Sequence, residues 1–331
     1  MREELVSVII PVYNAEQTLH VCLEALRSQT YPNLEFIFIN DCSTDGSLAL
    51  LQHFAESMED KPSPTIKIVS HAQNQGVASA RNTGLDNATG IYVYNVDADD
   101  HIEPEAIALM AAAAKKADAD IVGFNWFLTF QQNERKMKQP AFRDAWDAVQ
   151  QMLAGTMRWN LWLFLVRRSL YEEKQIRFQP GMNMGEDLLV MMKLFVHARS
   201  VTYLDKHLYH YGQSNTNSLT KTYSDRHIME VTANINEVDR VLRNSKFATE
   251  IGDHLDFLKL NIKLPLLISD KKEQYQRWLA WFPEANAKIN KNKALPLRTR
   301  LLQELAARRQ FWAVKLYYKL VIRLIYGILY K

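Results

Sequence analysis

Apolar residues in the first 127 positions come in short runs that alternate with segments of helical spacing. The run at 5–12 (LVSVIIPV) is almost continuously apolar, as in a strand buried on both faces of a parallel sheet. In 16–29, by contrast, apolar residues recur at the spacing of one helix face: Leu19, Cys22, Leu23 and Leu26. The alternation continues and predicts further strands at 34–40, at 66–69, from Ile91 onward and at 120–127, with helices between them.

The second half of the chain has less regular patterning. Residues 126–158 contain no clear strand pattern, and the polar, basic stretch 131–139 is typical of a loop. We interpret the aromatic stretch 159–171 (WNLWLFLVRRSLY) as a core segment, although one of its tryptophans could instead stack on a sugar. Helical spacing returns at 228–242, at 251–268 and in the last stretch, 308–331.

Strands that alternate with helices through short loops predict an α/β fold, in which helices cover a mostly parallel sheet. We expect one domain at 1–222, with halves at 1–125 and 126–222, and a helical C-terminal region at 223–331. In such sheets, ligands bind at the carboxyl ends of the strands. Three polar clusters follow predicted strands and should therefore meet at that edge: Tyr13-Asn14, Asp41-Cys42-Ser43 and Asp97-Ala98-Asp99-Asp100.

Composition narrows the class of protein only a little. A net charge of +3 is too small to indicate a nucleic-acid partner, and two cysteines in 331 residues predict neither a disulfide framework nor a thiolate zinc site. The chain enters a strand pattern after four residues, and no uncharged apolar run reaches the ~18 residues that a membrane span needs. We therefore expect a protein without a signal peptide, in the reducing environment of the cytoplasm.

Three acids, Asp97, Asp99 and Asp100, end the strand-forming run IYVYNVDADD, where a buried strand would not favour them. Asp97 and Asp99 are separated by one residue, so both carboxylates can approach one cation. Hard oxygen ligands suit Mg²⁺ or Mn²⁺, which also accept substrate phosphate oxygens. The alternative is that these acids are solvated loop residues or helix caps, and Asp100 could cap the helix that begins near Pro104.

The common glycine-rich phosphate loops do not occur in the sequence. The first predicted strand is not followed by G-x-G-x-x-G, which argues against a dinucleotide enzyme, and no G-x-x-x-x-G-K-[ST] loop is present. The charge of a bound phosphate would therefore be balanced by a metal ion and by side chains. Arg81, within NQGVASARN, is the natural candidate, although it could equally be an exposed helix arginine.

Two stretches together resemble the donor-binding half of family 2 glycosyltransferases. They read SVIIPVYNAEQTLHVCLEALRSQTYPNLEFIFINDCSTDGS and NQGVASARNTGLDNATGIYVYNVDADD, and the likeness covers residues 5–125 without a large gap. The resemblance implies a GT-A fold, which is an α/β domain that binds a nucleotide-diphosphate sugar, and a reaction that inverts the anomeric carbon. It also implies a role in bacterial surface polysaccharide or lipopolysaccharide synthesis, with UDP-sugars as the commonest donor class.

The resemblance assigns three groups of residues to the donor site. The nucleotide would contact Pro11, Tyr13, Asn14 and Asp41. The diphosphate and ribose would lie beside Arg81, Asp97 and Ala98. The metal ion, Mn²⁺ or Mg²⁺, would be held mainly by Asp99, with Asp100 beside it. The chain departs from the family where it reads Asn40-Asp41, because two acids are common there, and this departure leaves the contact of Asp41 with the base in question.

A second motif, Gly185-Glu186-Asp187, precedes the apolar helix LLVMMKLF. The helix dipole favours acids in the first turn, which would explain both of them without any function. The family has a matching motif on its acceptor side, and the resemblance implies that Asp187 is the general base. Glu186 would support it, or would be the base in its place. Transfer to a hydroxyl needs such a base because the proton must leave as the new bond forms.

The stretch 208–220 (LYHYGQSNTNSLT) also resembles the family and would form a lid over the diphosphate. Related enzymes often carry an arginine near Gly212-Gln213, and this chain lacks it, whereas Ser218 and Thr220 are present. The missing arginine puts the chemistry of the lid in question. His210 could touch phosphate or metal, but a single histidine is more often structural.

The last predicted helix combines basic and apolar residues. Four basic residues follow one another at spacings of seven, four and four: Arg308, Lys315, Lys319 and Arg323. Apolar surface comes from Trp312, Leu316, Leu320, Ile325, Ile328 and Leu329. A basic amphipathic helix can lie in a membrane interface, which would place the protein peripherally on the inner face of the cytoplasmic membrane. The alternative is a helix that packs on the domain with its charges in water.

These patterns together predict an inverting glycosyltransferase that moves a sugar from a nucleotide-diphosphate sugar to a hydroxyl of a glycan or lipid-linked acceptor. A nucleotidyltransferase or a nucleotide-sugar hydrolase could use the same acids, but it would not need Gly185-Glu186-Asp187. A non-catalytic subunit that tethers a partner to the membrane would not need the acids at all.

Overall fold

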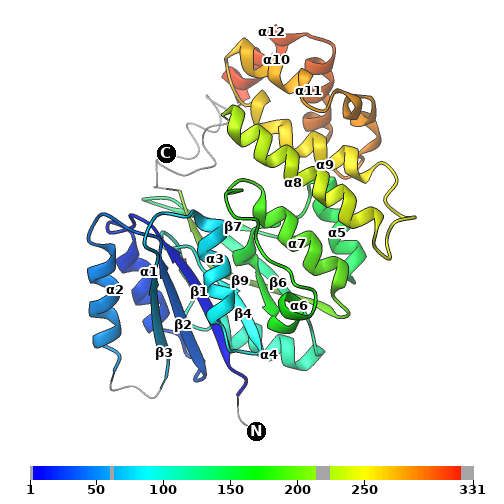
Figure 1. The fold of residues 1–331 in the computed structure, drawn as a ribbon. Helices are drawn as coiled ribbons and strands as arrows, with labels where there is room; N and C mark the ends of the chain where they lie inside the picture. The colour runs from blue at the N-terminus through cyan, green and yellow to red at the C-terminus, as the bar shows by residue number, and fades with distance from the viewer. Residues whose placement is uncertain (1–2, 60–62, 214–223, 322–331) are drawn as a thin grey trace. The chain divides into compact units, whose positions relative to one another are not determined.

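The computed structural model describes residues 3–59, 63–213 and 224–321, and the chain divides into two compact units (Figure 1). Unit 1 comprises Met1–Ala148 and Trp159–Val241, and unit 2 comprises Val149–Arg158 and Leu242–Lys331. Two helices, α5 (Ala145–Ala154) and α8 (Asp225–Arg243), contribute residues to both units.

The described part of unit 1 is built on a nine-stranded sheet with the order β3-β2-β1-β4-β8-β6-β9-β5, and β7 pairs with β6. The strands are β1 (Val6–Val12), β2 (Leu34–Asn40), β3 (Thr65–Ser70), β4 (Tyr92–Asn95), β5 (His101–Ile102), β6 (Ile121–Thr129), β7 (Glu134–Met137), β8 (Phe164–Arg167) and β9 (Val201–Gly212). Nearly every residue of β1 and β2 is buried, as their continuous apolar sequences predict for central strands.

The sheet is mixed, whereas the sequence predicted a mostly parallel one. β1 runs parallel to β2 and β4, β2 to β3, and β6 to β9. The antiparallel pairs are β4–β8, β6–β8, β6–β7 and β5–β9. Three of the four antiparallel pairs come from two segments without a clear strand pattern, and the fourth joins the two-residue strand β5 to β9. Part of the predicted polar loop 131–139 forms β7, and part of the aromatic stretch 159–171 forms β8, which lies between β4 and β6.

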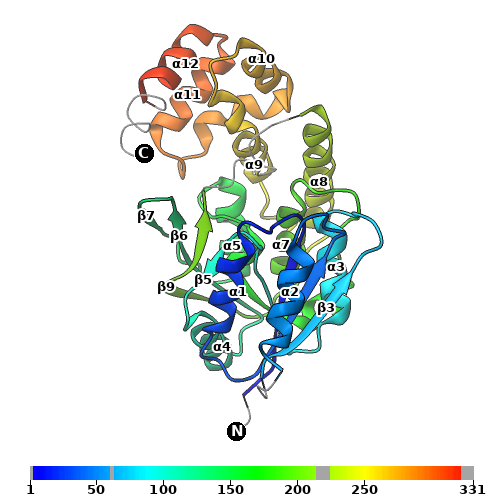
Figure 2. The same ribbon diagram turned by 90° about the vertical axis from the view of Figure 1, so that its left-hand side faces the viewer.

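Helices cover both faces of this sheet: α1 and α4 lie on one face, and α3 and α7 on the other (Figures 1 and 2). The helices of unit 1 are α1 (Leu19–Arg27), α2 (Ser47–Glu56), α3 (Val77–Asn87), α4 (Ala106–Ala117), α6 (Arg168–Glu173) and α7 (Glu186–His197), with a short 3₁₀ helix at Leu161–Leu163. The four apolar residues expected on the inner face of 16–29 are all buried in α1, which confirms that prediction.

Unit 2 is helical, as predicted for the C-terminal region. Its remaining elements are α9 (His254–Lys263), α10 (Lys272–Ala280), α11 (Leu297–Ala307) and α12 (Phe311–Tyr317), with 3₁₀ helices at Leu264–Leu267 and Pro283–Lys291. Trp278, Ile289 and Val314 are among the residues of its core. Within the described ranges, none of the helices has the length and apolar character needed to cross a bilayer.

The end of unit 2 differs from the single helix predicted at 308–331. α11 ends at Ala307, and α12 begins only at Phe311. Between them Arg309 has a φ of 59°, in the left-handed region that a helix cannot include. Residues 322–331 of the predicted amphipathic helix lie outside the described residues, among them Arg323, Ile325, Ile328 and Leu329.

Candidate active site at the carboxyl edge of the sheet

The loops that follow β1 and β2 are joined through Asn14. Its side-chain Oδ1 accepts a hydrogen bond from the backbone N–H of Thr44 at 2.8 Å, and its own N–H donates to Ser43 Oγ at 3.1 Å. Tyr13, just before it, is 51% exposed, and Pro11 is partly exposed at the end of β1. Two of the three polar clusters that were expected to meet at this edge are therefore in direct contact.

Asp41 at the end of β2 is buried and holds a neighbouring loop. Its carboxylate accepts hydrogen bonds from the backbone N–H groups of Gln75 and Gly76, at 2.9 and 2.7 Å. His71 Nδ1 lies 2.7 Å from the same carboxylate. Both carboxylate oxygens thus have partners within the protein, and these contacts fix the backbone immediately before α3. The predicted contact of Asp41 with the base stays a prediction.

The acids that follow β4 differ in their surroundings. Asp97 and Asp99 are partly exposed, whereas Ala98 is buried and Asp100 is only 1% exposed. One oxygen of Asp100 accepts a hydrogen bond from Tyr209 Oη at 2.7 Å, and the other accepts one from the N–H of Gly212 at 2.7 Å. Burial and the nearby acids raise the pKa of Asp100 well above its ordinary value. Asp100 therefore ties this turn to β9, and Asp99 is the better placed of the two predicted metal ligands.

No group of three or more His, Cys, Asp or Glu side chains in the described ranges is arranged to hold a metal ion by itself. Asp99 and Asp97 nevertheless present carboxylates at the exposed edge of the sheet, one residue apart. Mg²⁺ and Mn²⁺ are commonly held by one or two carboxylates, and substrate phosphates and water complete the coordination. The residues present therefore fit a divalent ion that is bound together with a diphosphate.

Arg81 on α3 joins the donor side of this edge to the motif at α7. Its Nη1 donates to Glu186 Oε1 at 2.8 Å and to Asp187 Oδ1 at 2.7 Å, while Nη2 donates to Asp97 Oδ1 at 3.3 Å. The guanidinium lies over the ring of Phe178, with its carbon 5.7 Å from the ring centroid. Because Arg81 is only 4% exposed, the alternative of an exposed helix arginine is wrong.

The charges around Arg81 do not balance, since three carboxylates share one guanidinium. Burial opposes the charge of Arg81, but the three acids raise its pKa above the ordinary value. Burial and Asp187 raise the pKa of Glu186 well above its ordinary range, and burial raises the pKa of Asp97 to about 6 against the opposing effect of Arg81. The raised pKa favours the protonated form of Glu186, which shares a side-chain hydrogen bond with Asp187.

Asp187 lies in the first turn of α7. The helix is preceded by Gly185, whose φ of 79° is a left-handed conformation that glycine adopts without strain. The first-turn position favours a carboxylate through the helix dipole. The side chain of Asp187 is 16% exposed, so it combines a fixed position with access from solvent.

Several residues that sequence reasoning did not identify hold the loop before α7. Asn183 Oδ1 accepts a hydrogen bond from the N–H of Ala78 on α3, and the N–H of Asn183 donates to Glu230 Oε2 on α8. Asn234, also on α8, donates through Nδ2 to the carbonyl of Met184 at 2.7 Å. The sequence did not indicate these contacts. A buried amide such as that of Asn234 needs a hydrogen-bond partner, but the sequence does not show which group that partner is.

Gly76 explains why the start of α3 can approach this loop. It has a φ of 83°, and a Cβ built on it would lie 2.5 Å from Asn183 Nδ2. A side chain at this position would therefore displace Asn183, which donates and accepts the hydrogen bonds described above. On the far side of the loop, Asn82 holds the backbone of Phe178 through two hydrogen bonds of 2.8 Å.

His210 is held by neighbouring side chains. Its ring stacks between those of His101 and Phe127, at centroid distances of 4.2 and 4.3 Å, and its Nε2 lies 2.9 Å from Glu103 Oε1. These contacts favour the structural interpretation of His210 over a contact with phosphate or metal. The other two predicted lid residues, Ser218 and Thr220, lie outside the described residues.

Trp162, in the aromatic stretch, is 3% exposed and stacks on Tyr209 at a centroid distance of 4.3 Å. The core interpretation of this tryptophan is confirmed. Tyr209 is the residue whose hydroxyl donates to Asp100, and the same hydroxyl accepts the N–H of Asp97 at 3.2 Å. The packing of Trp162 therefore helps to position the acids after β4.

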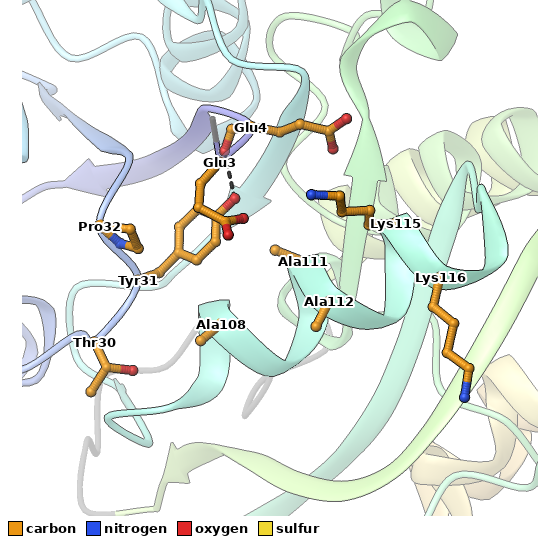
Figure 3. A pocket seen from close by; sticks show the side chains of 10 residues that line it. All are labelled: Glu3, Glu4, Thr30, Tyr31, Pro32, Ala108, Ala111, Ala112, Lys115 and Lys116. Carbon is orange, nitrogen blue, oxygen red and sulfur yellow. Dashed lines mark hydrogen bonds between the residues drawn. The ribbon is translucent and has the colours of Figure 1, made fainter. Parts of the chain in front are cut away.

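A hollow of about 480 Å³ lies at the opposite edge of the sheet, before β1 and β2 begin (Figure 3). Its lining includes Glu3, Tyr31 and, from α4, Ala108 and Lys115. None of its lining residues belongs to the cluster around Arg81. The acids at the carboxyl edge and this hollow are therefore separate features of unit 1.

Comparisons with known proteins agree with this architecture. Residues 7–187 match Glycosyl transferase family 2. The chain is 30% identical over 239 residues to the uncharacterized glycosyltransferase EpsJ of Bacillus subtilis strain 168, covering 68% of this chain and 67% of EpsJ. Among the first curated relatives, the matched part spans from 36% to 75% of the relative's own length.

Solved structures are similar over most of the chain. The crystal structure of Staphylococcus aureus TarS 1–349 in complex with UDP-GlcNAc has a TM-score of 0.71 at 20% identity, and the match covers 95% of this chain and 91% of TarS 1–349. The mannosyltransferase PcManGT from Pyrobaculum calidifontis, in complex with GDP-Man and Mn²⁺, has a TM-score of 0.56 at 18% identity and covers 98% of this chain and 86% of PcManGT. The chain has the GT-A fold predicted from its sequence and belongs to glycosyl transferase family 2.

Proposed function

We propose that this chain is an inverting glycosyltransferase that moves a sugar from a UDP-sugar to a hydroxyl of a glycan or lipid-linked acceptor in cell-surface polysaccharide synthesis. The observation that carries the proposal is the position of Arg81 between Asp97, on the donor side, and Asp187, on the acceptor side. A single buried guanidinium brings the donor-binding edge and a candidate base into one site. A protein that only tethers a partner would not need this arrangement.

In this proposal, Asp187 takes the proton from the acceptor hydroxyl as that hydroxyl attacks the anomeric carbon from the face opposite the leaving diphosphate. Arg81 fixes Oδ1 of Asp187 at 2.7 Å, and Oδ2, which accepts a longer hydrogen bond of 3.4 Å from the N–H of Leu161, would take the incoming proton. Glu186 is less suited to this role because burial and Asp187 raise its pKa, which favours its protonated form. Glu186 instead acts as a neutral hydrogen-bonding neighbour of Asp187.

Asp99 would hold a divalent ion, with Asp97 beside it facing the nucleotide. Such an ion neutralises the charge that develops on the departing nucleoside diphosphate. Support comes from the partly exposed carboxylates at the sheet edge and from the Mn²⁺ bound by PcManGT. Asp100 has a supporting role in this proposal, because Tyr209 and Gly212 already occupy its two oxygens.

The nucleotide would lie along the loops after β1 and β2, in contact with Pro11, Tyr13 and Asn14. Tyr13 is exposed next to this edge and could pack on a flat base. UDP is the donor class in the proposal because TarS, which has the same fold, was crystallised with UDP-GlcNAc. Arg81 is already paired with three carboxylates, so in this proposal it orders the acids and does not itself bind the diphosphate.

The test combines donor binding with transfer. UDP-, GDP- and dTDP-sugars are screened by thermal shift with Mn²⁺, with Mg²⁺ and with chelator, and the donor that binds is then incubated with candidate acceptors. We expect stabilisation by UDP-sugars that depends on the metal, and a glycosylated product of inverted configuration. Release of free sugar without any glycosylated product would indicate a hydrolase instead. Failure of every nucleotide sugar to bind would contradict the proposal.

A further inference from the structure

The exposed apolar side chains of this protein are concentrated at the end of unit 2. Ten large apolar residues are exposed in the described part of the chain, and half of them lie in 297–320. These five are Leu297 and Leu301 on α11 (60% and 52% exposed), Trp312 and Leu316 on α12 (72% and 49%), and Leu320 just after it (50%). An exposed tryptophan among exposed leucines is unusual for a surface in contact only with water.

The packing of α12 shows that this exposure belongs to one side of the helix. Val314 is fully buried, and the ring of Phe311 packs against Tyr275 of α10 at a centroid distance of 5.5 Å. Trp312, Leu316 and Leu320 follow at intervals of four and so form a row on the helix surface away from Val314. The side of α12 that carries Val314 packs within unit 2, whereas the side that carries Trp312 and Leu316 is apolar but exposed.

The segment that contains this exposed apolar row is strongly basic. Residues 295–321 contain six basic side chains and one acid, a net charge of +5, whereas the whole chain carries only +3. Lys315 and Lys319 are exposed beside the row, and Arg298, Arg308 and Arg309 are exposed nearby. The one acid, Glu304, is paired with Arg308. Exposed apolar and exposed basic side chains therefore occur together on α11 and α12 and just after α12.

We propose that α11 and α12 dock unit 2 onto the surface of an anionic lipid bilayer. Apolar residues with tryptophan would enter the boundary between headgroups and acyl chains, and the lysines and arginines would contact the lipid phosphates. Charge decides between this occupant and a second copy of the chain, because two such surfaces would repel each other. The inference goes beyond the proposed transferase activity and does not depend on it.

The experiment is flotation of the full-length protein with vesicles, one set of phosphatidylcholine alone and one containing about 30% phosphatidylglycerol. We expect the wild-type protein to float with the anionic vesicles and to remain unbound with the neutral ones. Binding should weaken in roughly 0.5 M NaCl because salt screens the attraction. Each lysine is expected to contribute roughly five-fold to the partition coefficient, so Lys315→Glu with Lys319→Glu should reduce it by at least ten-fold.

The matched pair of variants is Trp312→Glu and Met229→Glu. Met229 is 69% exposed on α8, so the two changes introduce the same charge at equally exposed apolar positions. We expect Trp312→Glu to reduce binding to anionic vesicles at least ten-fold and Met229→Glu to leave it unchanged. Circular dichroism and thermal melting of both variants control for folding.

Three results would overturn the inference. The first is a wild-type protein that does not float with anionic vesicles, or floats equally well with neutral ones. The second is a Trp312→Glu protein that is folded and binds as the wild type does. The third is a wild-type dimer in light scattering that Trp312→Glu converts to a monomer without affecting vesicle binding, which would assign the surface to a second copy of the chain.

Discussion

Within the described residues, each unit buries one long cationic side chain, Arg81 or Lys263, and the two are neutralised in different ways. Arg81 in unit 1 contacts three carboxylates, those of Asp97, Glu186 and Asp187. Lys263 in unit 2 is fully buried, and no carboxylate in the described part of the chain lies within hydrogen-bonding distance of it. Its Nζ donates instead to the carbonyls of Trp281 and Phe282, at 2.8 and 3.1 Å, and to Asn286 Oδ1 at 2.7 Å.

The difference separates a reactive arrangement from a structural one. The hydrogen-bond partners of Lys263 given above are all neutral oxygens, and its ammonium lies 4.3 Å from the centroid of the Trp278 ring. Lys263 therefore fixes the end of α10 and has a structural role. Around Arg81 the negative charge is in excess, so at least one acid must take up a proton or meet a further cation. Such imbalance is costly for stability, and it is typical of sites selected for chemistry.

The largest effect is expected from Asp187→Asn. Removing the proposed base while keeping the shape of the side chain should lower the transfer rate by roughly 10²–10⁴-fold. Donor binding, measured by thermal shift with UDP-sugar and Mn²⁺, should stay intact because the proposal places Asp187 on the acceptor side. The matched control is Glu186→Gln, which puts a neutral amide where the raised pKa of Glu186 favours a neutral carboxyl, and it should cost far less.

The comparison of these two variants tests which acid is the base. If Glu186→Gln lost more activity than Asp187→Asn, Glu186 would be the base. Asp187 would then be its neighbour in the cluster around Arg81 and not the group that takes the proton. Turnover of Asp187→Asn close to that of the wild type would remove the base assignment altogether.

Arg81→Gln should be the next largest change. It removes the cation from a buried cluster and leaves the carboxylates unpaired, which typically costs about 3–5 kcal/mol of unfolding free energy. Urea denaturation measures this loss, and transfer assays below the unfolding transition should show reduced activity as well. Arg81→Lys keeps the charge but not the planar group that contacts both Asp97 and Asp187, so it should recover stability better than activity. Equal recovery of both would mean that Arg81 acts only through its charge.

Lys263→Met should reduce stability without affecting transfer. Its three oxygen partners would lose their donor, which we expect to cost about 1–3 kcal/mol in urea denaturation. Transfer per folded molecule should be unchanged because unit 2 contributes no residue to the cluster around Arg81. Lys259→Met, on the same helix, is the control, since Lys259 is partly exposed and its ion pair with Glu284 should contribute less than about 1 kcal/mol. A loss of transfer in Lys263→Met would contradict the division into a reactive and a structural cation.

The smallest effect is the pH dependence that Lys263 confers. Burial lowers the pKa of Lys263 from 10.5 to about 7. Between these values the unfolded chain binds a proton that the folded chain does not, so the free energy of unfolding rises with pH. We expect wild type to gain about 1 kcal/mol relative to Lys263→Met between pH 7 and pH 8. A constant difference between the two proteins would mean that the three oxygens keep Lys263 charged.

The elements predicted well from sequence are those that carry their own periodicity. β1, β2 and α1 each contain enough residues to show a buried run or a helix face, and the structure has all three. β8 is only four residues long and lies within an aromatic run, where a strand cannot be told from any other core segment. Two of the four antiparallel pairs involve β8, so much of the mixed character of the sheet could not be predicted either.

The candidate site was predictable as a set of residues but not as a network. The acids of IYVYNVDADD and of Gly185-Glu186-Asp187 can be recognised in the sequence because acidic residues are uncommon next to buried apolar runs. Their connection through Arg81 did not stand out, because Arg81 and Asp187 are 106 positions apart and only tertiary packing brings them together. The roles of Tyr209 and Asn234 were missed for the same reason, since a tyrosine in a strand and an asparagine in a helix carry no signal of the acid or loop that they hold.

The anchoring of the loop before α7 bears on how this enzyme can be divided or recombined. The family match ends at residue 187, yet Glu230 and Asn234, which hold the backbone on which Asp187 depends, come later, from α8. A chimera joined at 187, or a chain shortened to 222, would keep every acid of the site and lose the helix that sets the position of Asp187. A chimera that is meant to take its acceptor specificity from a relative should therefore take α7 and α8 from that same relative.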